Sequence, residues 1–332
     1  MLSASSYYPG MPRPLSLTVV IAAYNEEAAL PSLHARLASV LDQLKPIDCR
    51  VLYVDDGSQD QTWARLQAIA QSDPRVAALR LSRNFGKEQA LTAGLDLAEG
   101  DAAVVLDADG QDPPELLPQF VARWQEGFDV VYGTRTSRQG ESWMKKATAK
   151  AFYRVMNRLS QTGIPADTGD FRLMSRRVLD ALRALRERQR FMKGLFAWVG
   201  FPQSSIAYER QPRIAGASKF SYWRLWNFAL EGITGFSTAP LRAATYLGLI
   251  TAVLAFFYGA FVIVKTLLWG DPVQGWPSMM AVVLFLGGVQ LMALGIIGEY
   301  LGRLYLETKQ RPLYLVQEWR PAGIDASGLQ QE

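Results

Sequence analysis

The chain has 332 residues, room for about two domains of ordinary size, and a formal net charge of +4. This near-balanced charge argues against a protein that binds nucleic acid through its overall charge, so no nucleic-acid partner is expected. The single cysteine, Cys49, excludes an internal disulfide, and its apolar neighbours predict a buried free thiol. Residues 1–15 are expected to form an N-terminal tail. The N-terminus has no long apolar segment, so no secretory signal is expected.

Five short apolar runs predict the strands of a sheet. They are rich in valine, isoleucine and leucine and do not alternate with polar residues, which is typical of strands buried on both faces. The runs cover residues 17–23, 50–54, 76–81, 102–106 and 129–133. Helical patterns separate them, and Asn25 is the expected N-cap of the first helix. Alternating strands and helices predict an α/β fold with a doubly wound, mostly parallel sheet.

A polar cluster follows each of the five predicted strands. In chain order the clusters read AYNEE, DDGSQDQT, SRNFGKE, DADGQD and GTR. The carboxyl ends of parallel strands lie at one edge of a sheet, and ligands of such sheets bind there. The five clusters are therefore expected to line one crevice.

The cluster DADGQD carries two carboxylates, Asp107 and Asp109, directly after a strand. Together with the side-chain oxygen of Gln111 they predict a site for Mg²⁺ or Mn²⁺, hard cations that prefer oxygen ligands and complete their shell with phosphates and water. A nucleoside diphosphate is the expected partner. A solvated acidic turn is the alternative for two aspartates alone, and the register with the other clusters disfavours it.

The second and third clusters supply further candidate ligands. Asp55 and Asp56 are expected to accept hydrogen bonds from a base or a ribose, although an ordinary Asp-Gly turn has the same residues. Lys87 is expected to neutralise a phosphate, with a solvated surface lysine as the alternative. His34, the only histidine, falls on the first helix away from the strand ends and is expected to be non-catalytic.

Residues 135–158 are strongly basic, with Glu141 as the only acidic residue. The cations are Arg135, Arg138, Lys145, Lys146, Lys150, Arg154 and Arg158. From Trp143 onward, apolar residues recur at near-helical spacing. This pattern predicts a basic amphipathic helix at an anionic membrane surface, and an ordinary solvated helix is the alternative.

Two long uncharged runs, Ala243–Val264 and Pro277–Gly298, are each long enough to cross a bilayer core of about 30 Å. Two helices buried in a large core are the alternative. Arginine and lysine flank the pair on its outer sides and are absent from the connection WGDPVQGWP, which predicts that both termini are cytoplasmic. Lys265, near the outer end of the first run, can reach the membrane interface. The expected organisation is a cytoplasmic domain, an interfacial helix, a transmembrane hairpin and a cytoplasmic tail, over residues 16–220, 221–240, 241–306 and 307–332.

The chain resembles the family-2 inverting glycosyltransferases that load a sugar onto a polyprenyl phosphate, such as dolichol-phosphate mannose synthases and bactoprenol-phosphate glucosyltransferases. The resemblance covers nearly all of residues 16–311. It rests on the motifs YNEE, VDDGSQDQT, RNFGKEQA, DADGQDPPE, GTR, DTGDFRLMSRRV, RFMKGLFAWVGF, YERQPRIAGASKF and FSTAPLR. The two-span tail is similar to the bacterial glucosyltransferase branch.

This resemblance implies a GT-A fold and a divalent metal, Mg²⁺ or Mn²⁺, held by Asp107, Asp109 and Gln111. It implies a nucleotide-sugar site formed by Ala23, Tyr24, Asn25, Glu26, Asp55, Asp56, Lys87, Asp107, Arg213 and Lys219. Asp109, Asp170 and Arg135 are the implied catalytic residues. The acceptor phosphate and the membrane surface are assigned to Arg135, Arg138, Lys145 and Lys146.

The implied reaction transfers a sugar, glucose from UDP-glucose, onto undecaprenyl phosphate for the cell envelope. UDP-GlcNAc, a UDP-amino-arabinose-type donor and GDP-mannose are the alternatives; a processive polysaccharide synthase or a non-catalytic membrane module is less favoured. The resemblance also implies a homotetramer, and Gly298 and Gly302 form a small-residue motif suited to helix packing. Two residues depart from the family. Ala22 replaces a proline, and Gly110 replaces a bulky residue, which either loosens the metal loop or supplies a left-handed backbone angle.

Overall fold

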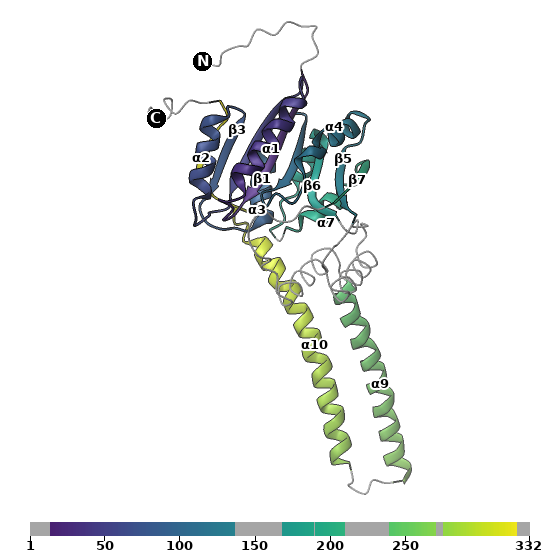
Figure 1. The fold of residues 1–332 in the computed structure, drawn as a ribbon. Helices are drawn as coiled ribbons and strands as arrows, with labels where there is room; N and C mark the ends of the chain where they lie inside the picture. The colour runs from purple at the N-terminus through teal and green to yellow at the C-terminus, as the bar shows by residue number, and fades with distance from the viewer. Residues whose placement is uncertain (1–13, 137–167, 189, 210–238, 270–274, 324–332) are drawn as a thin grey trace. The chain divides into compact units, whose positions relative to one another are not determined.

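The computed structural model describes residues 14–136, 168–188, 190–209, 239–269 and 275–323. The chain divides into two compact units (Figure 1). The first contains residues 1–150, 164–220 and 312–332, and the second contains residues 151–163 and 221–311. The C-terminal segment thus belongs to the same unit as the N-terminal half of the chain.

An eight-stranded mixed sheet forms the centre of the first unit, in the order β7-β5-β6-β4-β1-β2-β3-β8. The strands are β1 (Ser16–Ala23), β2 (Asp48–Asp55), β3 (Val76–Leu81), β4 (Ala102–Asp107), β5 (Val130–Arg135), β6 (Thr168–Ser175), β7 (Gln203–Tyr208) and β8 (Val316–Arg320). The pairs β1–β2, β1–β4, β2–β3 and β5–β7 are parallel, whereas β6 and β8 run antiparallel to their neighbours. The five strands expected from the sequence are all confirmed.

Helices cover both faces of this sheet (Figure 1). They are α1 (Leu30–Gln43), α2 (Thr62–Ser72), α3 (Lys87–Leu97), the 3₁₀ turn η1 (Pro114–Leu116), α4 (Leu117–Gln125), α6 (Arg176–Ala184) and α7 (Met192–Trp198). Side chains of α1, α2 and α4 share one buried cluster with the sheet, and side chains of α3 share the cluster on the other face. Cys49 lies in the first cluster as a buried free thiol, as expected.

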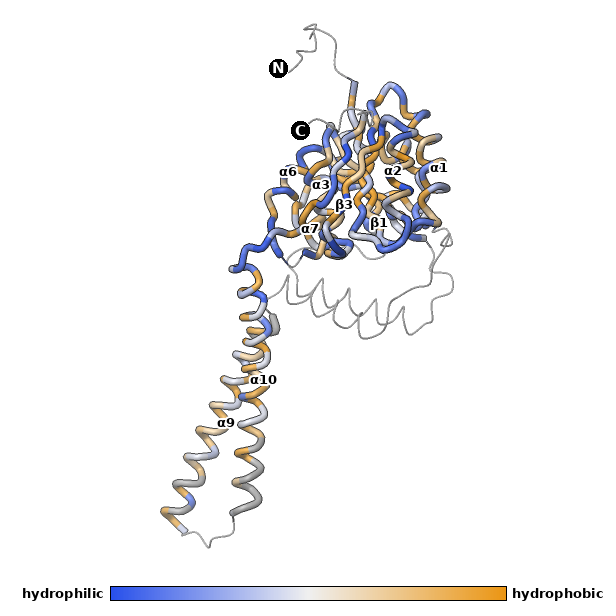
Figure 2. The backbone as a smooth tube through the Cα atoms, turned by 90° about the vertical axis from the view of Figure 1, so that its left-hand side faces the viewer, coloured by the Kyte–Doolittle hydropathy of each residue, from blue (hydrophilic) through white to orange (hydrophobic). Residues whose placement is uncertain are grey.

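The second unit contains two long helices, α9 (Ala239–Trp269) and α10 (Trp276–Thr308), which contact each other. Each contains a stretch that is long and apolar enough to cross a membrane, Ala243–Phe261 and Phe285–Thr308. Their apolar side chains are exposed rather than buried, and Figure 2 shows hydrophobic residues along both helices. Phe256, for example, is 72% exposed. Helices that are apolar and uncovered in this way associate with membranes.

The first helix does not begin as expected. Asn25 is not its N-cap, because α1 begins at Leu30 after Ala29 and its start makes no side-chain capping hydrogen bond. Asn25 instead adopts a left-handed backbone angle, φ 55°, and its side-chain oxygen accepts a hydrogen bond from the backbone of Gln59. A small polar side chain suits an N-cap and a tight left-handed turn equally well, so the sequence pattern does not separate the two.

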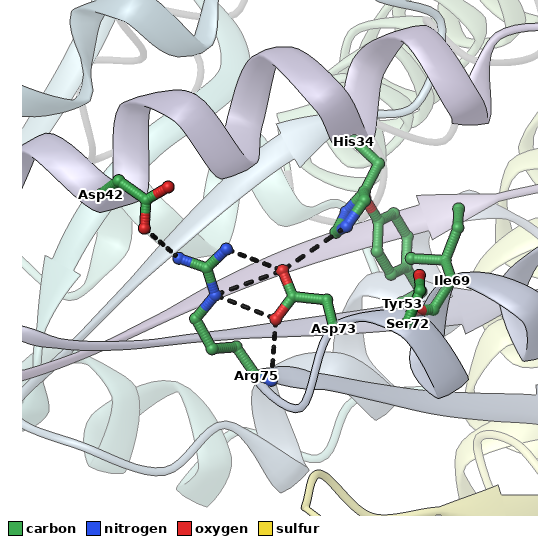
Figure 3. Close-up of polar contacts among 7 residues, drawn as sticks. All are labelled: His34, Asp42, Tyr53, Ile69, Ser72, Asp73 and Arg75. Carbon is green, nitrogen blue, oxygen red and sulfur yellow. Dashed lines mark hydrogen bonds and ion pairs between the residues drawn. The ribbon is translucent and has the colours of Figure 1, made fainter.

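His34 lies on α1 in a partly buried polar cluster (Figure 3). Its Nδ1 is 3.1 Å from the hydroxyl of Tyr53, and its Nε2 is 3.6 Å from a carboxylate oxygen of Asp73. Arg75 holds the same carboxylate and also reaches Asp42. The contacts tie α1 to the segment between α2 and β3. They support the expectation that His34 is structural.

His34 is expected to make the stability of the fold depend on pH. Burial lowers the pKa of His34 below its ordinary value of 6.5; Asp73 opposes this shift and Arg75 adds to it. The unfolded chain therefore binds more protons than the folded chain as the pH falls, so the stabilisation present above the ordinary pKa is lost below it. Between about pH 7 and pH 5, thermal unfolding scans should show a larger loss for the wild type than for His34→Gln. Equal losses would contradict this role of His34.

Candidate active site

The polar clusters expected at the strand ends lie together at the carboxyl edge of the sheet. Ala23 at the end of β1 is in register with Asp55 at the end of β2, and Ala22 is in register with Asp107 at the end of β4. Three strands therefore end within one residue of each other. The loops that follow them start from a common edge, as the sequence predicts.

Hydrogen bonds join the first two loops. The backbone N–H of Asn25 donates to the hydroxyl of Ser58, and the backbone N–H of Glu26 donates to that of Thr62, at 3.0 and 2.9 Å. The side chain of Asn25 accepts from Gln59 in return. The loops that contain the motifs AYNEE and DDGSQDQT are thus held together by hydrogen bonds. Ala23 is buried within it, whereas Tyr24 and Glu26 are half-buried and Asn25 is exposed.

The two adjacent aspartates of the second loop are buried and hold the neighbouring loops in place. Asp56, 3% exposed, accepts hydrogen bonds from the backbone N–H groups of Phe85 and Gly86 in the third loop. Asp55, 0% exposed, accepts one from Ser58. Burial raises the pKa of both carboxyls. Their contact with a nucleotide stays a prediction, and within the chain they shape the loops of the site.

Lys87 connects the third cluster to the fourth. It begins α3, and its ammonium lies 2.6 Å from Asp107 and 2.7 Å from Asp170. Asp170 belongs to β6, whose antiparallel register with β4 places Arg172 opposite Val105 and so carries Asp170 alongside the end of β4. Three residues assigned to the site from the sequence are therefore in direct contact. One lysine separates two carboxylates that would otherwise repel each other.

Asp170 is nearly buried and remains ionised. Burial by itself would raise its pKa, but the positive charges of Lys87 and Lys193 outweigh burial and hold the pKa of Asp170 below its ordinary value. Lys193 lies on α7 and is half-buried, and its partial removal from water lowers its own pKa. A carboxylate stabilised in this way is a weak proton acceptor and a strong electrostatic group.

Glu88, the neighbour of Lys87, anchors this part of the site. Its carboxylate accepts a hydrogen bond of 2.6 Å from the backbone N–H of Met192 at the start of α7. Burial raises the pKa of Glu88 to about 7, and the charge of Asp170 adds to this effect. Neither Glu88 nor Lys193 is among the residues expected from the sequence, although both lie inside motifs that carry the family resemblance. A half-buried charge of this kind gives no periodic signal in a sequence.

Arg135, the last residue of β5, lies at the other side of Asp170. Its guanidinium lies directly beside Gly169, since a Cβ atom added to that glycine would be only 2.8 Å from it. Its Nε donates to the hydroxyl of Tyr208 at 3.5 Å. Tyr208 in turn donates to the carboxylate of Asp112. The fifth cluster is thereby linked to the fourth. Tyr208 and Asp112 are two further site residues that the sequence did not single out.

The predicted metal ligands form a short loop of oxygen donors. Gln111 donates its backbone N–H to a carboxylate oxygen of Asp109 at 3.1 Å, so the two residues share one turn after Asp107. Among the described residues there is no group of three or more histidine, cysteine, aspartate or glutamate side chains that could hold a metal ion. Two carboxylates with an amide oxygen still fit a hard divalent cation that takes its remaining ligands from a diphosphate and water.

Gly110, between these ligands, has φ 71°. Of the two alternatives expected for this glycine, a looser loop or a left-handed backbone angle, the structure shows the left-handed angle. Gly110→Leu should lower the free energy of unfolding by about 1 kcal/mol, because a side chain is strained at this angle. Gly110→Asn should lose less, since asparagine tolerates the left-handed region. Thermal unfolding of the three proteins checks this order. A leucine variant as stable as the wild type would contradict it.

Several predicted residues lie outside the part of the chain that the structure describes. These are Arg138, Lys145, Lys146, Arg213 and Lys219, together with the expected basic helix and most of the expected interfacial helix. Their roles stay predictions.

Comparison with known proteins identifies two regions of the chain. The model of glycosyl transferase family 2 matches residues 18–183, and the model of the GtrB C-terminal hairpin matches residues 239–304. A glycosyltransferase of Synechocystis sp. is 53% identical over 304 residues, 92% of this chain and 95% of that protein. The bactoprenol glucosyl transferase of Shigella phage SfX is 47% identical over 303 residues, 91% of this chain and 99% of that protein.

Solved structures with similar folds include two sugar transferases. Mannosyl-3-phosphoglycerate synthase from Rubrobacter xylanophilus has a TM-score of 0.46 at 17% identity, covering 65% of this chain and 71% of that one. Glucosyl-3-phosphoglycerate synthase from Mycobacterium tuberculosis, solved with Mn²⁺, UDP-glucose and phosphoglyceric acid, has a TM-score of 0.44 at 20% identity, covering 69% and 83%. The family match, together with the mostly parallel sheet, confirms the expected GT-A α/β fold.

Proposed function

Because the chain belongs to glycosyl transferase family 2, we propose that it transfers glucose from UDP-glucose to undecaprenyl phosphate, with inversion, at the cytoplasmic face of the inner membrane. The observation that carries this proposal is the joining of a charged strand-end site to a membrane hairpin in one chain. The relatives named bactoprenol glucosyl transferase support the choice of sugar and acceptor, since two of them match 91% of this chain at 47% and 46% identity.

At the donor side, Asp107, Asp109 and Gln111 would hold Mg²⁺ or Mn²⁺ together with the diphosphate. When bound, the cation neutralises the charge that develops on the departing diphosphate. Lys87 adds a second positive charge beside Asp107. The first two loops, joined through Asn25 and Ser58, would hold the nucleoside.

At the reaction centre, Asp170 and Arg135 would orient the acceptor phosphate and the sugar. A phosphate monoester has a second pKa near 6, so it is largely dianionic at neutral pH and needs no strong base to attack. The depressed pKa of Asp170 agrees with this, because an aspartate kept ionised by the charges of Lys87 and Lys193 orients groups better than it removes protons. Arg135 supplies a positive charge, and Tyr208 holds its guanidinium.

The proposed topology has two spans with the catalytic domain and both termini in the cytoplasm. β8 follows the second span and pairs with β3 of the catalytic sheet. Both ends of the hairpin therefore lead into one folded domain, which supports placing them on one side of the membrane. The arginine and lysine residues at these ends support the cytoplasmic side.

We also propose the homotetramer, with packing through α10. A Cβ atom placed on Gly298 or Gly302 would meet no described atom within 4 Å, so a single chain leaves this small-residue surface open. Surfaces of this kind allow close helix packing in membranes. Cross-linking of the enzyme in membranes, read out by gel mobility, tests the assembly.

A transfer assay tests the proposed function. The purified full chain in lipid vesicles is supplied with undecaprenyl phosphate, Mg²⁺ and radiolabelled UDP-glucose, and label is measured in the lipid phase. Parallel reactions with UDP-GlcNAc, a UDP-amino-arabinose-type sugar and GDP-mannose distinguish the alternative donors. A product of one sugar per lipid is expected, whereas a polymer would indicate a processive synthase. Absence of lipid-linked label with every donor would contradict the proposal.

A further inference from the structure

Three charged residues from three strands form one row across the carboxyl edge of the sheet. Asp55 of β2 is in register with Arg80 of β3, and Arg80 is in register with Glu318 of β8. Residues in register project from the same face of a sheet, so the side chains alternate in sign as negative, positive and negative. The row runs from the outermost strand to the loop that follows β2.

Glu318 is fixed by three donors. One carboxylate oxygen accepts from the indole N–H of Trp63, at 3.2 Å, and the other accepts from Gln67 at 3.2 Å and Arg320 at 3.0 Å. Trp63 and Gln67 both belong to α2, the helix that begins where the DDGSQDQT motif ends. Glu318 therefore attaches β8 to α2 as well as to β3.

Arg80 carries this attachment inward to Asp55. Its guanidinium lies over the ring of Trp63, 5.7 Å from the ring centre, and its Nε lies 3.4 Å from a carboxylate oxygen of Asp55. Asp55 is completely buried, so Arg80 supplies the positive charge that compensates it. Trp63, which donates its indole N–H to Glu318, thus lies between Glu318 and this positive charge.

Asp55 connects the row to the loops of the proposed donor site. Its other oxygen accepts from the backbone of Ser58, whose hydroxyl accepts from the backbone of Asn25. A displacement of Arg80 would consequently change the positions of Asp55 and of both loops that are hydrogen-bonded through Ser58. None of these contacts involves Asp170 or Arg135.

We propose that Glu318, in the segment after the second membrane helix, is a positioning residue for nucleotide binding. It acts through Trp63 and Arg80 on Asp55 and so sets the geometry of the first two loops. The proposal rests on the proposed function, because it takes those loops as the site of the nucleoside. It makes the strand that returns from the membrane hairpin a part of the donor site.

Isothermal titration of UDP in the presence of Mg²⁺ into the full-length protein tests the proposal. Glu318→Ala should weaken UDP binding roughly fivefold, which corresponds to about 1 kcal/mol of binding free energy. Trp63→Phe, which keeps an aromatic ring but loses the indole N–H together with the pyrrole part of the side chain, should weaken binding less. Gln317→Ala, at the exposed neighbour on β8, is the matched control and should bind as the wild type does.

A positioning role differs from a general loss of stability in its kinetic pattern. In transfer assays, the KM for UDP-glucose should rise in Glu318→Ala while the KM for undecaprenyl phosphate and the thermal unfolding midpoint stay unchanged. If the thermal unfolding midpoint of Glu318→Ala falls instead, the same measurements are made on Glu318→Gln. This variant keeps the shape of the side chain and an oxygen acceptor for Trp63.

The outcomes separate the two proposals. If the Glu318 variants bind UDP as tightly as the wild type does, the role of Glu318 is overturned and the proposed function is unaffected. Equal increases in both KM values would overturn it as well. A wild type that binds no UDP would overturn the proposed function, and the role of Glu318 would fall with it.

Discussion

Asp109→Asn is expected to reduce sugar transfer by roughly three orders of magnitude, the effect of removing a group that neutralises charge on a leaving diphosphate. Asparagine keeps a side-chain oxygen that can accept the hydrogen bond from the backbone of Gln111, so the turn should persist. The loss would then come from the missing carboxylate charge. Lipid-phase label from radiolabelled UDP-glucose measures the effect.

Asp48→Asn is the matched control for this change. Asp48 is an exposed aspartate at the opposite end of β2, away from the loops of the site. Its variant should retain the wild-type rate and show that one lost surface carboxylate does not impair the enzyme. An Asp109→Asn protein that keeps more than about a tenth of the wild-type rate would exclude the proposed metal role.

Lys87→Met should lower activity by roughly two orders of magnitude and also reduce stability. Without the ammonium, the carboxylates of Asp107 and Asp170 face each other with no positive charge between them. Removing one member of a buried ion pair costs several kcal/mol, but the side chain of Lys87 is 45% exposed, so we expect about 1–2 kcal/mol. Transfer rates and thermal unfolding measure the two effects.

Two further variants separate the charge of Lys87 from its shape. Lys87→Arg keeps the charge in a planar group and should recover stability more fully than activity, because a guanidinium does not place a point charge between two carboxylates in the same way. Lys45→Met, at an exposed lysine remote from the site, should change neither. If Lys87→Met transferred sugar at the wild-type rate, the lysine would be a surface residue without a role.

Much of the catalytic sheet was predictable from the sequence, because strands buried on both faces are read as continuous apolar runs. β6 was not predicted as a strand, since nothing in its sequence shows that it enters the sheet antiparallel between β4 and β5. β8 was not predicted because its residues, VQEWR, are mostly polar, as is usual for a strand at the edge of a sheet. The segment was expected to be only a tail.

The site was predictable at the strand ends and less so between them. Lys87, Asp107 and Asp170 were assigned separately from the sequence. The structure shows that Lys87 forms ion pairs with both aspartates. Lys193 and Glu88 were missed because their importance comes from their position beside Asp170, which depends on where α7 lies in the fold. The sequence did not determine the backbone angle of Gly110, which is left-handed in the structure.

The position of β8 also bears on how the protein is made. Chain order requires the ribosome to produce the first seven strands, then both apolar helices, and only then β8. Until that point β3 is an open edge with unpaired backbone groups, which invites contact with other chains. Completion of the sheet therefore follows synthesis of the membrane hairpin. A truncated product that ends within the hairpin would always lack its last strand.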